Sequence, residues 1–385
     1  MMEDVFNDES IVLRPTVIDV DLEALRWNLA QVRSLVGGAR IMATVKANAY
    51  GHGLLRTSRE LLRFGADELG VAFLEEGIAL RRAGIRAPIL VLGGIIGNQI
   101  GHFLEYDLDI TASSAYKLRQ IDETAAAMGK RARVHVKIDT GMGRIGIRPE
   151  NAAQLFEAAL AATHCDLVGV FSHFAASHAA DTTGTNEQLE RFNDTVSYFS
   201  SIGAPMPTRH IANSGAVLQH PETVLDMVRP GIMLYGVYPG PEVRRSAELH
   251  PVLSMKTRVV YFKVIPEGFS LGYDHTWTST RSTRIITLPV GYGDGYARAL
   301  SNRGEVLLHG KRYPIVGRIS MDQCMVDIGG DSGYNGDEVV LIGRQDEERI
   351  TVEELAEHCG TIPYEILTMI NTRVPRHYTY GGALR

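Results

Sequence analysis

The sequence has few cysteines and no long apolar run, and each shortage excludes a class of protein. Its three cysteines, Cys165, Cys324 and Cys359, are far apart and match no metal-ligand spacing. They favour buried structural roles in a reducing compartment over a disulfide framework. No stretch approaches the roughly 20 apolar residues that span a bilayer, and the acidic N-terminal residues do not resemble a secretory signal. We therefore expect a cytoplasmic protein with no membrane partner.

An excess of positive charge is also missing, which argues against nucleic acid as a partner. The 39 Lys and Arg residues are outnumbered by 45 Asp and Glu residues, so the formal net charge is −6. The composition is instead that of an ordinary globular protein, 45% hydrophobic and 22% charged over 385 residues. A chain of this length exceeds one ordinary core, which predicts two domains.

Short apolar runs alternate with helical patterns through the first part of the chain. Runs rich in Val and Ile and bounded by Gly or polar residues are typical of strands buried on both faces. The runs are 41–45, 69–73, 88–92, 108–111, 133–138, 167–172, 208–212 and 228–234. Alternating strand and helix predicts parallel pairing, and about eight such units predict a (β/α)8 TIM barrel over residues 15–240. A doubly wound open sheet is the alternative.

Three helix ends carry recognisable signals. Asp21 precedes a stripe of apolar residues at helical spacing and is a suitable N-cap. A second amphipathic stripe stops at Gly203, a residue type favoured just after a helix. Thr351, with a glutamate three residues later, predicts a capping box at the start of a further helix.

From about residue 241 the pattern changes to short strands. Two apolar runs flank Gly310-Lys311, which predicts a hairpin. We expect a mostly β domain over residues 241–385. Residues 1–14 precede the first barrel helix and could pack on either domain.

The first apolar run ends in a lysine, Lys46, followed within one loop by Tyr50 and two glycines. Catalytic groups of barrel enzymes lie at the C-terminal ends of the strands. A lysine at a strand end is usually a solvated charge. In a semi-enclosed barrel mouth, however, desolvation lowers its pKa and makes the amine nucleophilic toward an aldehyde.

The run around Lys46, VKANAYGHG at 45–53, resembles the cofactor-attachment motif of alanine racemases. The resemblance continues in order through HVKIDTGMGR at 135–144, HIANS at 210–214, VRPGI at 228–232, GYGDGY at 291–296 and RISMD at 318–322. An ordered series of six such blocks is not a chance match. It implies a pyridoxal-phosphate enzyme, an isomerase that interconverts L-alanine and D-alanine for peptidoglycan synthesis.

The resemblance implies two catalytic bases. Lys46 would hold pyridoxal phosphate as a Schiff base and act on one face of the substrate α-carbon, with Tyr273 on the opposite face. Unperturbed tyrosine ionises near pH ~10, so Tyr273 needs a neighbouring cation. Arg144 would contact both this tyrosine and the substrate carboxylate, for which a guanidinium is suited.

Further cofactor contacts follow from the same resemblance. His173 follows the sixth strand run and would shape the site, and Arg229 would face the pyridine nitrogen. An arginine there can donate but not accept, which weakens the electron sink and disfavours transamination and decarboxylation. The residues expected around the cofactor and its phosphate are Tyr50, Asn213, Ser214, Gly231 and Ile232.

Some residues of the site are expected from a second subunit. The resemblance implies that Met321 and Asp322 reach into the partner's site, that Tyr292 lines its mouth, and that Tyr273 is also supplied by the partner. A shared site of this kind requires a homodimer.

Two positions carry separate expectations. Some relatives carry a carbamylated lysine at the position of Lys137, where the modification turns a cation into an anion. Relatives often have a tyrosine that reaches the cofactor phosphate two residues before the Val-Pro-Arg segment. This chain has Thr372 there, so the contact would be absent, water-mediated or supplied by a group such as Tyr50.

Three other functions compete with alanine racemisation. A racemase of broader specificity, acting on serine, is open because an apolar pocket discriminates one methylene or hydroxyl by only ~1–3 kcal/mol. A basic-amino-acid decarboxylase of similar architecture typically has a Gly-Gly-Gly phosphate loop, which this chain lacks. A non-catalytic carrier built on the barrel alone leaves the second domain without a role.

Overall fold

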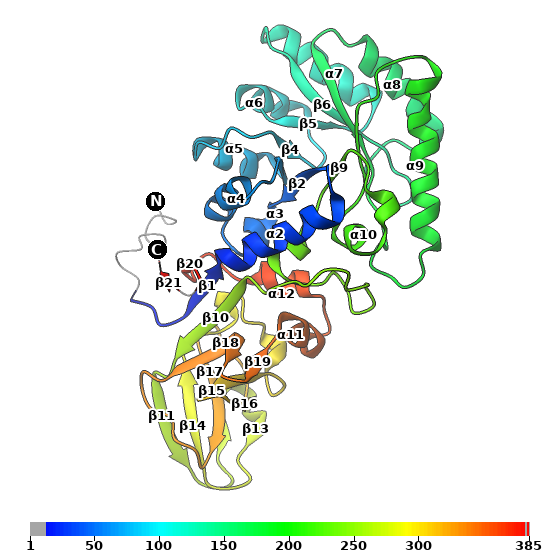
Figure 1. Cartoon of the computed structure of the whole chain (residues 1–385). Helices are drawn as coiled ribbons and strands as arrows, with labels where there is room; N and C mark the ends of the chain where they lie inside the picture. The colour runs from blue at the N-terminus through cyan, green and yellow to red at the C-terminus, as the bar shows by residue number, and fades with distance from the viewer. Residues whose placement is uncertain (1–12, 382, 385) are drawn as a thin grey trace. The chain divides into compact units, whose positions relative to one another are not determined.

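The computed structural model describes residues 13–381 and 383–384 (Figure 1). Residues 1–12, whose packing the sequence left open, lie outside the described residues. Contacts divide the described residues into a barrel unit, residues 25–49 and 53–250, and a β unit, residues 13–24, 50–52, 251–381 and 383–384. Residues 15–24 were expected with the barrel and 241–250 with the second domain, and each group falls on the other side of this division.

The barrel unit is built on an eight-stranded sheet in which every neighbouring pair is parallel. The strands follow the order β8-β7-β6-β5-β4-β3-β2-β9. Their bounds are β2 (Arg40–Thr44), β3 (Glu68–Val71), β4 (Ile89–Val91), β5 (Asp109–Ala112), β6 (Ala132–Lys137), β7 (Cys165–Phe171), β8 (Thr208–His210) and β9 (Met227–Val228).

The two ends of this sheet are joined by backbone hydrogen bonds. The Asp226 amide donates to the Arg209 carbonyl at 3.2 Å, and the Arg229 amide donates to the Ala212 carbonyl at 2.9 Å. The strands run in sequence order without the reversal of a doubly wound sheet. The predicted (β/α)8 barrel is therefore confirmed, and the open-sheet alternative is wrong.

Helices cover the outside of the barrel (Figure 1). They are α2 (Leu22–Val36), α4 (Leu54–Arg63), α5 (Leu74–Arg82), α6 (Ile100–Glu105), α7 (Ala115–Ala127), α8 (Ala152–Ala161), α9 (Thr183–Ser201) and α10 (Ser214–Gln219). The Asp21 carboxylate accepts from the Glu23 and Ala24 amides at 2.8 and 3.2 Å, which confirms the predicted N-cap. Helix α9 ends just before Gly203, which has φ +67°, also as predicted.

The last apolar run of the barrel differs from the prediction. Only Met227 and Val228 form a strand, whereas Ile232–Tyr235 form a 3-10 turn, η5. Pro230 explains the interruption because it has no N–H to continue the ladder. The segment from Arg229 to Ile232 thereby becomes a loop at the carboxyl end of β9, where barrel enzymes carry their functional groups.

The β unit contains an eleven-stranded sheet in the order β11-β14-β17-β16-β15-β18-β10-β1-β20-β21, with β19 paired to β18. The bounds are β1 (Val17–Asp21), β10 (Leu253–Arg258), β11 (Tyr261–Ile265), β14 (Thr283–Leu288), β15 (Glu305–Leu308), β16 (Lys311–Val316), β17 (Cys324–Gly329), β18 (Glu338–Gln345), β19 (Glu348–Ile350), β20 (Arg376–Tyr380) and β21 (Ala383–Leu384). A small hairpin, β12 (Ser270–Leu271) with β13 (Trp277–Thr278), and two helices, α11 (Val352–Cys359) and α12 (Pro363–Met369), complete the unit.

Two local predictions in the β unit hold. Strands β15 and β16 form the expected hairpin, although its turn residues are His309 and Gly310 rather than Gly310 and Lys311. The Thr351 hydroxyl accepts from the Glu354 amide at 3.1 Å and caps α11. The mostly β character of this part of the chain is confirmed.

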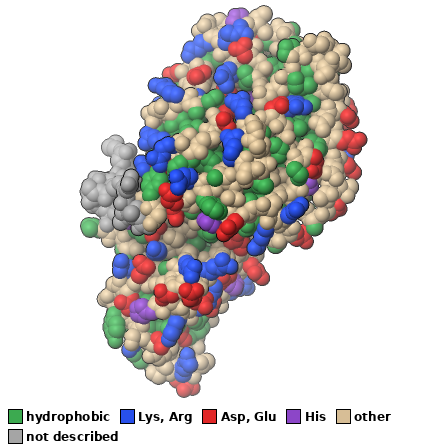
Figure 2. Space-filling view, in the orientation of Figure 1, with side chains coloured by type: hydrophobic (Ala, Val, Ile, Leu, Met, Phe, Trp, Pro, Cys, Tyr) green, Lys and Arg blue, Asp and Glu red, His purple; other side chains and the backbone are tan. Residues whose placement is uncertain are grey.

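The charged side chains on the face in Figure 2 are of both signs and interspersed, in keeping with the small net charge. Over the part of the chain that the structure describes, no helix is both long enough and apolar enough to cross a membrane.

Candidate active site

The chain takes an unusual turn directly after β2, beginning at Lys46. Ala47, Asn48, Ala49 and Tyr50 all have φ between 52° and 55°, a left-handed helical turn built without glycine. Each such residue costs roughly 1–2 kcal/mol relative to the right-handed form. Strain of this kind persists only where the surroundings hold it, and it is concentrated at functional sites.

Lys46 sits half-buried among charged groups of the barrel unit. Burial lowers the pKa of its amine, and Arg144 and Arg229 lower it further, whereas the Glu76 carboxylate opposes them. The net effect is a lowered pKa, which raises the neutral, nucleophilic fraction of the amine at any given pH. This is the property that the sequence led us to expect of Lys46.

Arg229, on the loop after β9, is 3% exposed and lies in the buried interior of the barrel unit. Its guanidinium donates to the Ser172 carbonyl at 2.6 Å, to the His210 carbonyl and Nδ1 at 2.8 Å each, and to His173 Nδ1 and the Ile211 carbonyl at 3.2 Å each. Burial lowers the pKa of Arg229 to about 9, which leaves it protonated at neutral pH. The network fixes the guanidinium as a donor in one orientation.

A column of polar side chains continues from Arg229 through the barrel interior. Because Arg229 only donates, His210 must accept at Nδ1 and carry its proton on Nε2, which lies 2.9 Å from His135 Nδ1. His135 Nε2 in turn lies 3.5 Å from the Asp109 carboxylate. A Cβ on Gly169 would lie 2.2 Å from His135 Nδ1, so this position excludes any larger residue.

Lys137 and His173 are enclosed near Arg229. Lys137 is 5% exposed, and its amine lies 4.2 Å from the centre of the Phe171 ring. Burial lowers the pKa of both side chains well below the usual range, and Arg229 lowers both further. The Phe171 ring face favours a cationic Lys137, but the desolvation cost and the like charge nearby favour the neutral amine.

Arg144 lies on the exposed loop that follows β6. The loop is pinned by the Asp139 carboxylate, which accepts from the Gly141 and Gly143 amides at 3.1 and 3.0 Å. Arg144 is close enough to lower the pKa of both Lys46 and Lys137. Arg144 is therefore an exposed cation near both amines, on a loop whose backbone Asp139 holds.

The expected phosphate-binding residues come together at the ends of β8 and β9. The Ser214 hydroxyl accepts from the Gly231 amide at 2.8 Å and from the Met233 amide at 3.3 Å, which ties the two loops to each other. The Asn213 side chain accepts from the Ala216 amide at 3.1 Å. Asn213, Ser214, Gly231 and Ile232 therefore lie together at neighbouring strand ends.

Tyr50 belongs to the β unit and lies beside a tyrosine that the sequence analysis missed. Its ring centre is 6.1 Å from that of Tyr364, near the start of α12. Burial raises the pKa of Tyr50, and burial raises that of Tyr364 to about 12, so both hydroxyls are neutral donors. Thr372 is exposed and bonds only weakly to Asn371, at 3.4 Å. Tyr364 therefore offers a second tyrosine hydroxyl close to Tyr50, whereas the short Thr372 side chain contacts Asn371.

Tyr273 is 71% exposed and borders a cavity of the β unit. The cavity has a volume of about 390 Å³ and is lined by Gly272, Tyr273, Thr287, Arg318, Ser320, Gln323 and Met325. The neighbouring Asp274 has φ +62° and pairs with Arg318 at 3.5 Å. A large aromatic side chain exposed on a strained turn is typical of a group that contacts something outside its own unit.

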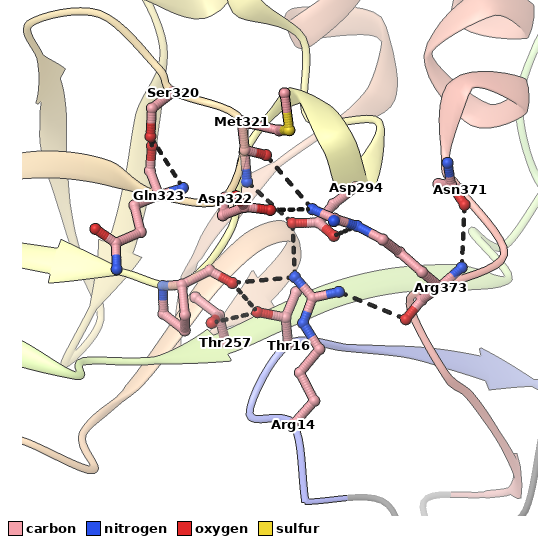
Figure 3. Close-up of polar contacts among 12 residues, drawn as sticks. Arg14, Thr16, Thr257, Asp294, Ser320, Met321, Asp322, Gln323, Asn371 and Arg373 are labelled. Carbon is pink, nitrogen blue, oxygen red and sulfur yellow. Dashed lines mark hydrogen bonds and ion pairs between the residues drawn. The ribbon is translucent and has the colours of Figure 1, made fainter. Parts of the chain in front are cut away.

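The other residues expected from the β unit lie in two adjoining loops, one with Tyr292 and one with Met321 and Asp322, the latter two labelled in Figure 3. The Tyr292 and Gly293 amides donate to the Ser320 and Met321 carbonyls at 3.1 and 2.9 Å. A Cβ on Gly291 would lie 2.1 Å from the Ser320 carbonyl, so this contact requires glycine. Tyr292 is 42% and Met321 53% exposed, and Asp322 is also exposed.

A buried aspartate, Asp294, fixes these loops (Figure 3). Its carboxylate pairs with Arg14 and with Arg373, both at 2.7 Å, and Arg373 also contacts Asp322 at 2.8 Å. Burial alone would raise the pKa of Asp294, but the hydrogen bonds from the two arginines hold it below its usual range. The loops of Tyr292 and Met321 are therefore held as one rigid surface.

Comparison with known proteins covers both units. Residues 20–239 match the family model for the alanine racemase N-terminal domain, and residues 252–378 match that for the alanine racemase C-terminal domain. Alanine racemase 2 of Caldanaerobacter subterraneus subsp. tengcongensis is 43% identical over 373 residues, 96% of each chain.

Solved structures agree. An alanine racemase of Clostridium difficile 630 has a TM-score of 0.92 at 35% identity, covering 97% of this chain and 98% of that one. A histidine racemase from Leuconostoc mesenteroides subsp. sake has a TM-score of 0.89 at 28% identity, covering 97% of this chain and 100% of that one. The matches extend over nearly the whole chain and include the segments that carry the site, and the protein therefore belongs to the alanine racemase family.

Proposed function

We propose that this protein is a pyridoxal-phosphate-dependent racemase that interconverts L-alanine and D-alanine. The observation that carries the proposal is the position of Lys46 at the end of a barrel strand, with the pKa of its amine lowered by burial, in a chain that matches this family over both units. Arg144 and Arg229 beside it supply the cationic surroundings that an anionic cofactor and a carboxylate substrate need.

The residues present fit the cofactor. Lys46 would hold its aldehyde carbon, and the buried Arg229 would face its pyridine nitrogen. The Ile232 amide and the Ser214 hydroxyl, which still has a hydrogen to donate, suit a phosphate, with the Asn213 side chain nearby; the Gly231 amide ties the two loops together by donating to Ser214. In the β unit, the neutral hydroxyls of Tyr50 and Tyr364 can also donate to a phosphate, as the tyrosine replaced by Thr372 does in relatives. His173 would line the ring.

Pyridoxal phosphate, when bound, supplies an electron sink that acidifies the α-hydrogen of the amino acid. Arg144 binds and orients the substrate carboxylate. The Lys46 amine takes or returns a proton on one face of the α-carbon, and the Tyr273 hydroxyl does so on the other. Since one base serves each face, inversion follows without rotation of the substrate. Arg229 can only donate, which limits the electron sink and suppresses transamination.

This mechanism implies a homodimer, because Lys46 and Tyr273 of one active site would come from different chains. Tyr273, Tyr292, Met321 and Asp322 are exposed on the β unit, and we propose that they complete the partner's site. Substrate would reach Lys46 past Tyr292, and Met321 and Asp322 would shape the pocket.

Mixing two inactive variants tests the shared site. We expect Lys46→Ala and Tyr273→Ala each to be inactive alone, and a re-equilibrated equimolar mixture to recover about a quarter of wild-type activity. Half of the dimers are then hybrids, and each hybrid has one intact site. Activity is measured by circular dichroism and the oligomeric state by light scattering. No recovery in confirmed hybrid dimers would contradict a shared site.

Lys137 is proposed to be carbamylated. The neutral Lys137 amine forms a bond from Nζ to the carbon of CO2 and loses one proton, which leaves a carbamate anion beside Arg229 and Arg144. We expect one ¹³C-carbamate signal per chain in ¹³C-bicarbonate, absent in Lys137→Ala but present in Lys130→Ala. An unlabelled wild-type protein would rule the modification out.

The function itself is tested with L-alanine and cofactor-loaded protein in D2O. We expect the circular dichroism of the amino acid to decay to zero while deuterium enters the α-position. An unchanged signal would contradict the proposal.

Substrate breadth is measured with the same assay. The likeness to a histidine racemase makes an amino acid larger than alanine the second candidate. A higher kcat/KM for serine or histidine than for alanine would identify a racemase of broader or different specificity.

A further inference from the structure

A glutamate outside the expected site, Glu76, accepts a hydrogen bond from the strained turn that follows Lys46. Glu76 lies in the first turn of α5, in the barrel unit. Its Oε1 accepts from the Ala47 amide at 2.7 Å, and Ala47 is the residue directly after Lys46. Its Oε2 accepts from the Ala72 and Phe73 amides at 2.8 and 3.1 Å. One carboxylate thus joins the loop after β2 to the loop after β3.

The far side of the turn is closed by Asn48. Its side-chain carbonyl accepts from the Leu54 amide at 2.8 Å, and its backbone carbonyl accepts from the Gly53 amide at 2.9 Å. Ala47 has φ 53° and ψ 54°, which an L-residue adopts only where its surroundings hold it. Within the barrel unit, Glu76 holds the Lys46 side of this turn and Asn48 holds the other.

We propose that Glu76 is a positioning residue for Lys46, fixing the left-handed turn behind the lysine and setting a negative charge beside its amine. The proposal rests on the proposed role of Lys46 as cofactor holder and base. A strained backbone held at one point can place the amine within a narrow range. A shift of about 1 Å in a reacting group can lower a rate by about 100-fold.

The charge acts in a direction that can be measured. The groups that influence the Lys46 amine are Arg144 and Arg229, which lower its pKa, and Glu76, which raises it. His173 is also near, because Lys46 disfavours its protonation. Removing the Glu76 charge therefore lowers the pKa of Lys46, and the neutral amine forms at a lower pH.

Two variants separate charge from position. Glu76→Gln is nearly the same size but has one acceptor oxygen and an NH2, so it cannot accept from both loops. Glu76→Asp keeps the charge but is one methylene shorter. Glu75→Gln is the matched control, because Glu75 is exposed on the same helical turn and its loss removes the same charge.

We expect kcat of Glu76→Gln to fall about tenfold with KM nearly unchanged, and the acid limb of its kcat profile to move to lower pH. The pH midpoint of the bound cofactor's absorbance should move as well. Glu76→Asp should lose kcat while its midpoint stays near that of the wild type. Glu75→Gln should match the wild type in every measurement.

Isotope effects tell a positioning role from general damage. The enantiomers have equal free energies, so kcat/KM falls equally in both directions. If Lys46 alone is displaced, the α-deuterium effect rises for the enantiomer deprotonated by Lys46 and falls for the other. Thermal unfolding of the apoproteins reports any loss of folding separately.

The outcomes distinguish the two proposals. A wild-type protein that does not racemise amino acids contradicts the proposed function. A wild-type protein that does, with Glu76→Gln matching Glu75→Gln in absorbance midpoint and isotope effects, overturns the role of Glu76. Equal changes in the isotope effects of both enantiomers overturn it too.

Discussion

Lys46→Ala is expected to lower kcat/KM for alanine by at least about 10⁴-fold, the upper range for the loss of a positioned acid–base group. The variant loses both the amine that holds the cofactor aldehyde and the base on one face of the α-carbon. Cofactor should still bind, though less tightly, because Arg229 and the loops of Ser214 and Gly231 remain. The measurements are the racemisation rate by circular dichroism and cofactor content after dialysis.

Lys311→Ala is the control, since Lys311 is an exposed lysine on β16 that pairs with the exposed Asp331. Its kcat/KM should stay within about twofold of the wild type, because exposed pairs contribute little. Lys46→Arg keeps a positive charge but not a titratable amine, and it should be as inactive as Lys46→Ala. Retention of a tenth of wild-type activity in either Lys46 variant would remove the lysine from the mechanism.

Much of the barrel is predictable because its strands are buried on both faces. Burial selects continuous apolar runs such as 41–45 and 133–138, and these coincide with β2 and β6 to within one residue at either end. The run 228–234 failed because it is equally apolar but contains Pro230. Composition alone does not distinguish a buried loop from a buried strand.

Strand β1 shows the opposite error. Val17–Asp21 alternates buried and half-buried residues, which is the pattern of a strand with one covered face. It has no continuous apolar run of the kind that marks β2, and its partners β10 and β20 lie more than 200 residues away in the chain. Pairing over such distances is set by tertiary contacts.

The sequence predicts the main residues of the site, but not the residues that contact and position them. Lys46 and Arg229 lie in recognisable blocks. Tyr364 and Glu76 were not found from the sequence because their contacts, with Tyr50 and with Ala47, form only when the chain folds. The left-handed turn has no sequence signal either, because Ala47 and Ala49 are residues that ordinarily favour right-handed helix.

The second large effect is expected for Arg229→Lys. Lysine keeps the charge but has three donors on one atom, and it cannot span the acceptors that Arg229 reaches on Ser172, His210 and Ile211. Buried carbonyls left without a donor cost about 1–3 kcal/mol each. We expect the free energy of unfolding to fall by about 3 kcal/mol and kcat/KM by about 100-fold.

Arg209→Lys is the matched control, because Arg209 lies on β8 and pairs with Asp226 in a half-exposed setting. We expect it to lose no more than about 1 kcal/mol. Chemical denaturation measures the stabilities, and pyruvate formation measures transamination. If Arg229 limits the electron sink by donating without accepting, Arg229→Lys should form pyruvate no faster than the wild type, since lysine also only donates.

Arg229→Gln extends the argument, because glutamine can donate or accept but carries no charge. We expect it to form pyruvate faster than the wild type, because glutamine can accept from a protonated pyridine nitrogen and has no charge that opposes that proton. An unchanged rate of pyruvate formation would contradict the proposed role of Arg229 in reaction specificity. The buried column behind Arg229 supports this expectation. His210 presents Nδ1 as an acceptor and passes its own proton toward His135 and Asp109, so the column provides no proton to the ring side of Arg229. The column therefore leaves Arg229 as a donor, and the proposed limit on the electron sink rests on that donor character and on its charge.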